Sequence, residues 1–327
     1  MSVNRTSRRA VLLSCTAAVT GALLLSACGS DDSDSGKDRT AAATTRQITD
    51  AQGRKVEVPR DPRKVVTLSE PTTDATLALG MEPVGVTAGR GQQGVSTYLA
   101  DKASKAQVVA TVAEADMEKL AALHPDLILL DETTGAKKTV DKLQEIAPTV
   151  VTAKLNEDWK KSFTDTADAL NKKADAEKWL TDFDTEVAGL KKQLGDNAGR
   201  SVSVIRWQDG APSVVGKGDG VVGSTLKALG MARPKDQQGA STGHSEPVSL
   251  EKLTTIDGDW LFFGTLGDKA DGEKAYREAR KVANFGKLRA EKDKHVVVVE
   301  GSAWNSAGGP LSARVVLDDI KGALAGR

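Results

Sequence analysis

One stretch of this chain, residues 174–194, has the pattern of a long amphipathic helix with no break in it. Its apolar side chains recur three and four positions apart, at Leu180, Phe183, Val187, Leu190 and Leu194. That spacing places them on one face of an α-helix, and charged residues fill the other face. At ~1.5 Å per residue such a helix is roughly 30 Å long, about the width of a small domain.

The segments on the two sides of this helix resemble each other. Residues 117–120 read Met-Glu-Lys-Leu and residues 250–253 read Leu-Glu-Lys-Leu, at an offset of 133. An aspartate and an apolar run follow each segment at the same offset, beginning at Asp126 and Asp259. Ala-Leu-Gly-Met also occurs twice, at 78–81 and 228–231. Two echoes in the same order predict two similar lobes joined by a rigid helix.

The remaining pattern is that of an α/β protein. Continuous apolar runs alternate with helical segments, as in parallel sheets that are covered on both faces. We predict two Rossmann-like lobes with central parallel-type sheets: an N-terminal lobe at 46–156 that begins with a hairpin at 48–58, linking helices at 157–199, and a C-terminal lobe at 200–327.

Ligands of such sheets bind beyond the carboxyl ends of the strands. By that rule, the residues that follow the predicted strands are candidates for ligand binding: Ser69, Glu70, Arg90, Asp131, Glu132, Arg206, Trp207, Thr265 and 302–305. With two lobes, we expect these loops to face one another across a cleft.

The first 27 residues have the composition of a targeting segment rather than of a fold. Arg5, Arg8 and Arg9 precede an apolar run, and Leu-Ser-Ala-Cys ends it at Cys28. The run is shorter than the ~20 residues that a spanning helix needs, which argues against a transmembrane anchor. We predict a lipoprotein signal peptide at 1–27, lipidation of Cys28 and a flexible, polar tether at 28–45. The general secretory and the twin-arginine export routes both remain open.

Charge and cysteine content exclude several classes of protein. The 45 basic residues balance the 45 acidic ones, and the basic face or stripe of a nucleic-acid-binding protein is absent from the sequence. Cys15 would leave with the signal peptide, so the mature chain would hold no disulfide. The three histidines, His124, His244 and His295, lie in separate segments, which does not fit a bare transition-metal site.

In these features the chain resembles the class III solute-binding proteins of ATP-driven (ABC) importers, the group that carries iron-siderophores, haem and cobalamin. The resemblance covers essentially the whole mature chain. Its motifs are the lipobox at Cys28, the hairpin at 48–58, and the segments 65–68, 78–86, 117–130, 174–194 and 249–253.

The resemblance implies a function and two partners. It implies a monomeric, lipid-anchored protein on the outer face of the cell membrane, which captures an iron(III)-siderophore between its lobes and delivers it to an ABC permease dimer. It implies no enzyme activity and no cofactor. Haem or cobalamin remains the alternative ligand. A glutamate on each lobe docks onto permease arginines in such proteins, and the pattern falls on Glu118 and Glu251. The alternative is that both are ordinary helix-surface carboxylates beside lysines.

A chelated metal needs no protein ligands, only an apolar and aromatic pocket with a few polar donors. Guanidinium groups suit the oxygens of a chelator, and indole rings suit its organic part. We therefore expect these ligand contacts: Arg90, Trp304, Trp207, Arg206, Tyr98, His244 and Glu70. Trp304 lies where hydroxamate-siderophore binders similarly place a pocket tryptophan. The arginine that those relatives carry before the Glu118 helix is absent at 111–113, which leaves hydroxamate, catecholate and mixed chelators open.

Two further motifs bear on a different class of function, a secreted enzyme. Gly218, Gly220 and Gly223 match a dinucleotide-binding fingerprint between an apolar run and a helix, but no acidic residue ends a strand about 20 positions further on. Ser302 lacks the second glycine of a nucleophile elbow, and no His and Asp follow it in hydrolase order. A secreted Rossmann-like lipoprotein enzyme is therefore the remote alternative.

Overall fold

The computed structural model describes residues 44–240 and 243–325, which belong to one compact unit. The signal peptide, Cys28 and nearly all of the tether lie outside the described residues. No helix in the described part of the chain is both long enough and apolar enough to span a membrane. The described chain begins with the predicted hairpin, in which β1 (Thr45–Thr49) pairs antiparallel with β2 (Lys55–Pro59).

The N-terminal lobe is built on a parallel sheet, as predicted. Among the described residues its five strands lie in the order β5-β4-β3-β6-β7. The strands are β3 (Val65–Thr67), β4 (Gly85–Thr87), β5 (Gln107–Ala110), β6 (Leu127–Leu130) and β7 (Thr149–Val151). The helices between them are α1 (Glu70–Ala78), α2 (Met117–Ala122) and α3 (Val140–Gln144), with short 3₁₀ segments η1 (Thr97–Leu99) and η2 (Gly135–Thr139). All four residues of β6 are fully buried, which explains their uninterrupted apolar sequence.

The C-terminal lobe departs from the prediction in one strand. Its described residues form four strands in the order β11-β10-β8-β9: β8 (Val202–Gln208), β9 (Ala211–Val214), β10 (Trp260–Gly264) and β11 (Val296–Val298). We predicted parallel strands throughout, but β9 runs antiparallel to β8. Asp209 and Gly210 connect them with φ angles of 52° and 79°, as a two-residue hairpin turn requires.

Helices and 3₁₀ segments complete this lobe. The α-helices are α6 (Gly220–Leu229), α7 (Lys269–Ala279), α8 (Arg289–Lys292), α9 (Gly301–Trp304) and α10 (Pro310–Leu324). The 3₁₀ segments are η3 (Gly195–Asn197), η4 (Lys235–Gln237), η5 (Leu250–Ile256) and η6 (Phe285–Lys287). The echo segment at 250–253 thus begins a 3₁₀ segment, with non-helical backbone at Lys252.

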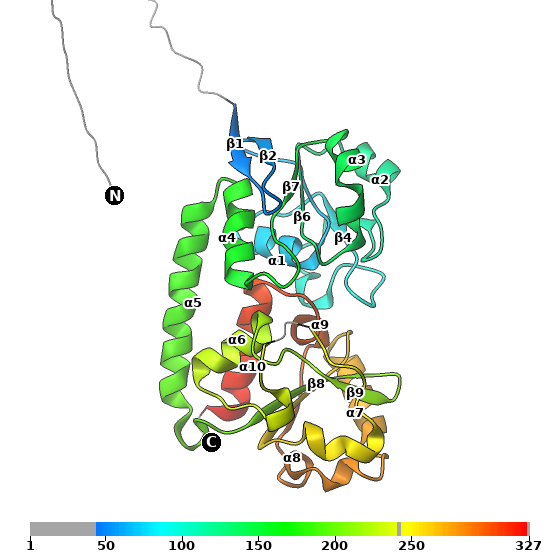
Figure 1. The fold of residues 1–327 in the computed structure, drawn as a ribbon, viewed down its shortest axis with the longest axis vertical. Helices are drawn as coiled ribbons and strands as arrows, with labels where there is room; N and C mark the ends of the chain where they lie inside the picture. Colours follow the sequence, from blue (N-terminus) through cyan, green and yellow to red (C-terminus); the bar gives the residue numbers. More distant parts are fainter. Residues whose placement is uncertain (1–43, 241–242, 326–327) are drawn as a thin grey trace, which may run out of the picture. The chain divides into compact units, whose positions relative to one another are not determined.

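The long helix joins the two lobes. It is α5 (Lys173–Gln193), which follows α4 (Trp159–Ala169) and runs along one side of both lobes (Figure 1). Phe183, Val187 and Leu190 on its apolar face are buried in the core of the C-terminal lobe. Trp179 on the same helix contacts the cores of both lobes. One rigid helix thus belongs to both hydrophobic cores, as the periodicity predicted.

The sequence echoes have structural counterparts. Gly80 and Gly230 both adopt left-handed backbone at the ends of α1 and α6, with φ angles of 75° and 77°. Asp126 accepts hydrogen bonds from the main-chain N–H groups just before β3, and Asp259 accepts one from the N–H of Ser201, just before β8. The repeated residues therefore occupy two equivalent places in each lobe. The glycine ends a helix with left-handed backbone, and the aspartate binds main-chain N–H groups at the start of a strand.

Candidate functional site

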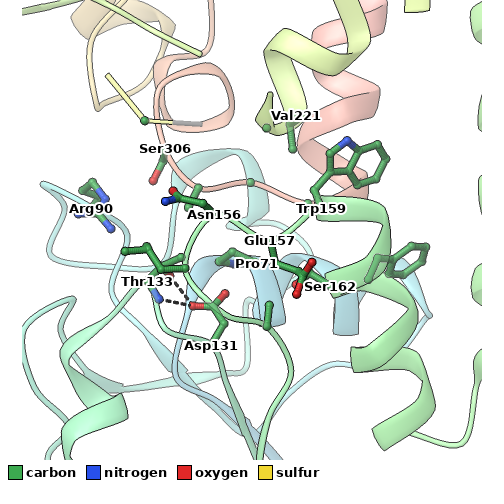
Figure 2. Close-up of a pocket in the computed structure, with 18 of the residues that line it drawn as sticks. Pro71, Arg90, Asp131, Thr133, Asn156, Glu157, Trp159, Ser162, Val221 and Ser306 are labelled. Atoms are coloured by element: carbon green, nitrogen blue, oxygen red, sulfur yellow. Dashed lines mark hydrogen bonds between the residues drawn. The ribbon is translucent and has the colours of Figure 1, made fainter. Parts of the chain in front are cut away.

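A cavity of about 360 Å³ lies between the two lobes and is walled by residues of both (Figure 2). The N-terminal lobe contributes α1 and the loops after β4, β6 and β7, and α4 contributes its first turn. The C-terminal lobe contributes the end of β8, the start of α6 and residues 305–310 before α10. The parallel strands β4, β6, β7 and β8 have their carboxyl ends at this cavity, as the topology of parallel sheets predicts.

Two arginines, one from each lobe, line this cavity. Arg90 follows β4, and Arg206 lies near the end of β8. The side chain of Arg206 is only 7% exposed, and its Nε has no hydrogen-bond partner among the described residues. Burial, together with the nearby charge of Arg90, lowers the pKa of Arg206 below its ordinary value. Two cations that destabilise each other in this way favour a negatively charged or oxygen-rich ligand.

Glu70 lies behind Arg90 and does not line the cavity. It is buried, and its carboxylate accepts a hydrogen bond of 3.1 Å from the main-chain N–H of Arg90. Its Oε2 is 4.0 Å from Arg90 Nε. The hydroxyls of Ser96 and of Ser306, which belongs to the other lobe, also donate to it. The sequence prediction of direct ligand contact is therefore corrected: Glu70 positions Arg90 and links the lobes.

The carboxylate of Asp131 is part of the cavity wall. It is buried and accepts a hydrogen bond of 2.8 Å from the main-chain N–H of Thr133, drawn in Figure 2. Burial raises the pKa of Asp131, and its hydrogen bonds with Thr133 and Ser69 act in the opposite direction. The loop after β6, which the sequence singled out, therefore forms part of the cavity wall.

The cavity wall contains a tryptophan that our prediction missed. Trp159, at the start of α4, lines the cavity together with Phe163. Its indole Nε1 donates a hydrogen bond of 2.9 Å to the hydroxyl of Ser224 on α6. Its ring also packs edge-on against Phe183 of the interlobe helix. The sequence feature that could have identified Trp159 is its position just beyond the last strand of the N-terminal lobe, at the first turn of a helix.

The structure corrects the predicted role of Trp304. Its side chain is fully buried, stacks on Phe262 with ring centroids 4.7 Å apart, and donates from Nε1 to Asp319 at 2.8 Å. It lies on the short helix α9, whose side chains pack onto the face of the sheet. Trp304 is therefore a core residue, and it is not part of the cavity wall.

Two more predicted contacts lie elsewhere. Successive residues of a strand point to opposite faces, so Trp207 points away from Arg206 and packs on Phe263 with centroids 5.7 Å apart. The hydroxyl of Tyr98 donates to Asp74 at 2.7 Å, and Tyr98 lies outside the cavity wall. His244 does line the cavity, with Nδ1 2.9 Å from the carbonyl oxygen of Ser245.

The two predicted docking glutamates lie away from the cavity. Glu118 and Glu251 are exposed, each in the first turn of its helical segment. Two residues further on, Leu120 and Leu253 are both fully buried. The internal repeat therefore presents an exposed carboxylate in the same local setting on both lobes.

The glycine-rich motif and Ser302 lie in settings that differ from those of a dinucleotide-binding fingerprint and of a nucleophile elbow. The motif opens α6, which follows the antiparallel strand β9 and not the first parallel strand of its sheet. Ser302 is buried, accepts a hydrogen bond from Thr97 of the other lobe and donates to Glu300. No group of three or more metal-ligating residues occurs within 44–240 and 243–325.

Comparison with known proteins agrees with this architecture. The periplasmic binding protein family matches residues 65–303. The probable siderophore-binding lipoprotein YfiY of Bacillus subtilis is 34% identical over 316 residues, which cover 91% of this chain and 93% of YfiY. The petrobactin-binding protein YclQ of the same organism is 28% identical over 318 residues, 94% of this chain and 96% of YclQ.

Solved structures share the fold. Staphylococcus aureus SirA complexed with staphyloferrin B has a TM-score of 0.70 and 26% identity, and the match covers 86% of this chain and 98% of SirA. The crystal structure of YclQ gives a TM-score of 0.71 with 23% identity, covering 86% of this chain and 98% of YclQ. The chain therefore belongs to the periplasmic binding protein family, in its class III of solute-binding proteins of ABC transporters.

Proposed function

We propose that this protein captures an iron(III)-siderophore complex in the cavity between its lobes and delivers it to the permease of an ABC importer. The observation that carries the proposal is the cavity itself, which combines two arginines from opposite lobes with an aromatic wall. The names of the relatives support it: YfiY is named a probable siderophore-binding lipoprotein, YclQ a petrobactin-binding protein, and SirA was solved in complex with staphyloferrin B.

The chemistry of the cavity suits a metal that arrives already chelated. A siderophore fills the coordination sphere of iron, so the protein must recognise the chelator's oxygens and its organic frame. Arg90 and Arg206 supply planar sets of N–H donors for those oxygens. Trp159 and Phe163 supply apolar surface for the frame. No step of this function requires catalysis or a resident cofactor, and we propose neither.

Export and anchoring complete the proposal. Two of the curated relatives, YfiY and YhfQ, are named as lipoproteins. We propose that the signal peptide is cleaved before Cys28, that lipid on Cys28 holds the protein at the outer face of the cell membrane, and that it acts as a monomer. Glu118 and Glu251 would then dock onto the permease dimer, one from each lobe.

Tryptophan fluorescence tests ligand binding directly. Among the five tryptophans, all within the described part of the chain, only Trp159 lines the cavity. Ferric siderophores should quench the emission of the purified mature protein at micromolar concentrations, and Trp159→Phe should remove most of that quenching. Trp207→Phe is the matched control, because Trp207 packs in the core of the C-terminal lobe. A protein that binds haem or cobalamin but no ferric siderophore would contradict the proposal.

A further inference from the structure

Two large apolar side chains are exposed within the described residues, and one of them lies at the cavity. Leu155 is 55% exposed and Leu250 is 37% exposed. Leu155 lines the cavity between the lobes, whereas Leu250 does not. A single exposed leucine is common on protein surfaces. Leu155 is distinguished by its place on the cavity wall and by the contacts that hold it there.

The loop that carries Leu155 joins β7 to α4 and is held by Glu132. The main-chain N–H of Leu155 donates to Glu132 Oε2 at 3.1 Å, and the N–H of Glu132 donates to the carbonyl oxygen of Ala153 at 3.1 Å. Gln52, in the turn of the β1–β2 hairpin, donates from Nε2 to Glu132 Oε1 at 3.2 Å. Both carboxylate oxygens of Glu132 therefore accept hydrogen bonds, one from the loop and one from the hairpin.

Glu132 itself does not line the cavity, although its neighbours Asp131 and Thr133 do. The hydrogen bonds from Leu155 and Gln52 lower the pKa of Glu132 below its ordinary value, because they favour the charged form. The sequence made Glu132 a candidate for ligand binding from its place after β6. Its partners in the structure instead give it the position of a support for the loop.

The backbone beside Leu155 has a defined turn. Asn156 has a φ of 66°, in the left-handed region that residues other than glycine seldom adopt. The N–H of Glu157 donates to the carbonyl oxygen of Lys154 at 3.2 Å, across this turn. Helix α4 then begins at Trp159, which also lines the cavity. Leu155 and Trp159 thus reach the cavity wall from one short segment of the chain.

The cavity wall differs in polarity from one side to the other. Figure 2 shows Arg90 and Trp159 on opposite sides of the cavity. Trp159 is accompanied by Phe163 on the same helix, and Leu155 precedes both in the chain. A ligand that matches this wall has polar oxygens at one end and an apolar part at the other. Contact with that apolar part would remove the side chain of Leu155 from water, which is favourable.

We propose that Leu155 covers an apolar part of the bound ferric chelate and that Glu132 positions it. This inference rests on the proposed function, because it names a part of the siderophore: rings or methylene chains that extend beyond the iron-binding oxygens. A chelate that is polar over its whole surface, such as ferric dicitrate, would leave Leu155 in water.

The affinity of a Leu155 variant tests the contact. The probes are ferric petrobactin, ferric staphyloferrin B and ferrichrome, whose frames contain rings or methylene chains, and ferric dicitrate, which is polar throughout. One of the first three should bind most tightly to the purified mature protein. Leu155→Ser should weaken that binding about tenfold, because apolar surface is no longer buried against the chelate. Leu250→Ser is the matched control and should leave the affinity unchanged, since Leu250 lies outside the cavity wall.

Chemical protection tests the same contact without relying on affinity. Cys15 and Cys28 are the only cysteines of the sequence. In the mature protein with Cys28→Ser, Leu155→Cys therefore introduces a single thiol. A saturating amount of the tightest-binding probe should slow the alkylation of this thiol by iodoacetamide. Leu250→Cys, made in the same background, should react at the same rate with and without the probe.

A double-mutant cycle tests the positioning role of Glu132. Glu132→Ala should weaken the binding of the same probe about fivefold, because the N–H of Leu155 loses its acceptor. In the Leu155→Ser background, Glu132→Ala should have little further effect, since the contact that it positions is already lost. Glu132→Gln keeps a carbonyl oxygen that can accept from the same N–H and should restore most of the affinity. An equal loss in both backgrounds would overturn the positioning role.

The possible outcomes separate this inference from the proposed function. Tightest binding of ferric dicitrate, equal affinity of wild type and Leu155→Ser, or an unprotected thiol in Leu155→Cys would overturn the contact while leaving chelate binding intact. Lowered iron-siderophore uptake by cells with unchanged affinity in Leu155→Ser would also overturn it, because the leucine would then meet the permease. Absence of binding to all four probes would overturn the proposed function itself.

Discussion

The carboxylate of Asp74, on α1 of the N-terminal lobe, accepts a hydrogen bond of 2.7 Å from the main-chain N–H of Leu311, on α10 of the C-terminal lobe. The N–H groups of Gly309 and Ser312 and the hydroxyl of Tyr98 donate to the same carboxylate. Asp74 is fully buried. One side chain therefore satisfies a helix start that belongs to the other lobe.

Replacing Asp74 should destabilise the fold. Asp74→Ala leaves four buried donors without an acceptor, and we expect a loss of about 3 kcal/mol or more in the free energy of unfolding. Asp74→Asn retains one carbonyl oxygen and should cost less than Asp74→Ala. Asp175→Asn, an exposed aspartate paired only with Lys172, should change stability by less than about 1 kcal/mol. Urea unfolding of the three variants measures these values. A cost of Asp74→Ala as small as that of Asp175→Asn would contradict the linking role.

Protonation of Asp74 should make a measurable contribution to the pH dependence of the unfolding free energy. Burial raises its pKa from 3.8 to about 6, against the lowering effect of its hydrogen bonds. The folded protein therefore takes up this proton more readily than the unfolded chain. The resulting stabilisation is fully present below pH 3.8 and is lost as the pH rises through about 6.

That contribution can be isolated by difference. Other carboxylates titrate in the same range, but they cancel when wild type and Asp74→Asn are compared at each pH. Between pH 7 and pH 4, wild type should gain roughly 2 kcal/mol in unfolding free energy relative to Asp74→Asn. Urea titrations at several pH values measure the difference. A difference that stays constant with pH would show that the pKa of Asp74 is not raised.

Most of the fold could be predicted from the sequence because its strands are buried on both faces. The run Leu127–Leu130 is apolar at every position, and the period of α5 is regular, so local pattern and final packing agree. The predicted direction of β9 was wrong, because β9 runs antiparallel to β8. Asp209-Gly210 is a hairpin signal, but the prediction assumed that helices link successive strands.

The site was harder to predict because it depends on which way side chains point. Arg206 and Trp207 are neighbours in sequence, yet strand alternation puts one at the cavity and the other in the core. Trp304 follows the last strand, as a ligand contact would, but the packing of α9 turns it onto Phe262. Tertiary packing determines the direction in which these side chains point, and the spacing of residues in the sequence does not reveal it.

Glu70 should affect ligand affinity through Arg90. Glu70→Gln removes the negative charge beside Arg90 and weakens the hydrogen bonds that hold its loop, so the affinity for a ferric siderophore should fall about tenfold. Glu82→Gln is the control, because Glu82 is exposed and pairs with Lys105 at the surface. Fluorescence titration measures the affinities. Unchanged affinity in Glu70→Gln would show that Arg90 holds its position without this carboxylate.

Docking and ligand binding should be separable by mutation. Glu118 and Glu251 are exposed and lie outside the cavity wall, so replacing both by Ala should leave the affinity for a ferric siderophore within about twofold. Iron-siderophore uptake by cells should nevertheless collapse if, as we propose, these two carboxylates dock onto cations of the permease dimer, one from each lobe. Glu145 and Glu278, one exposed glutamate from each lobe, provide the control pair. Their double replacement by Ala should leave uptake intact. If it lowers uptake as much as the loss of Glu118 and Glu251 does, then general surface charge, and not these two positions, governs docking.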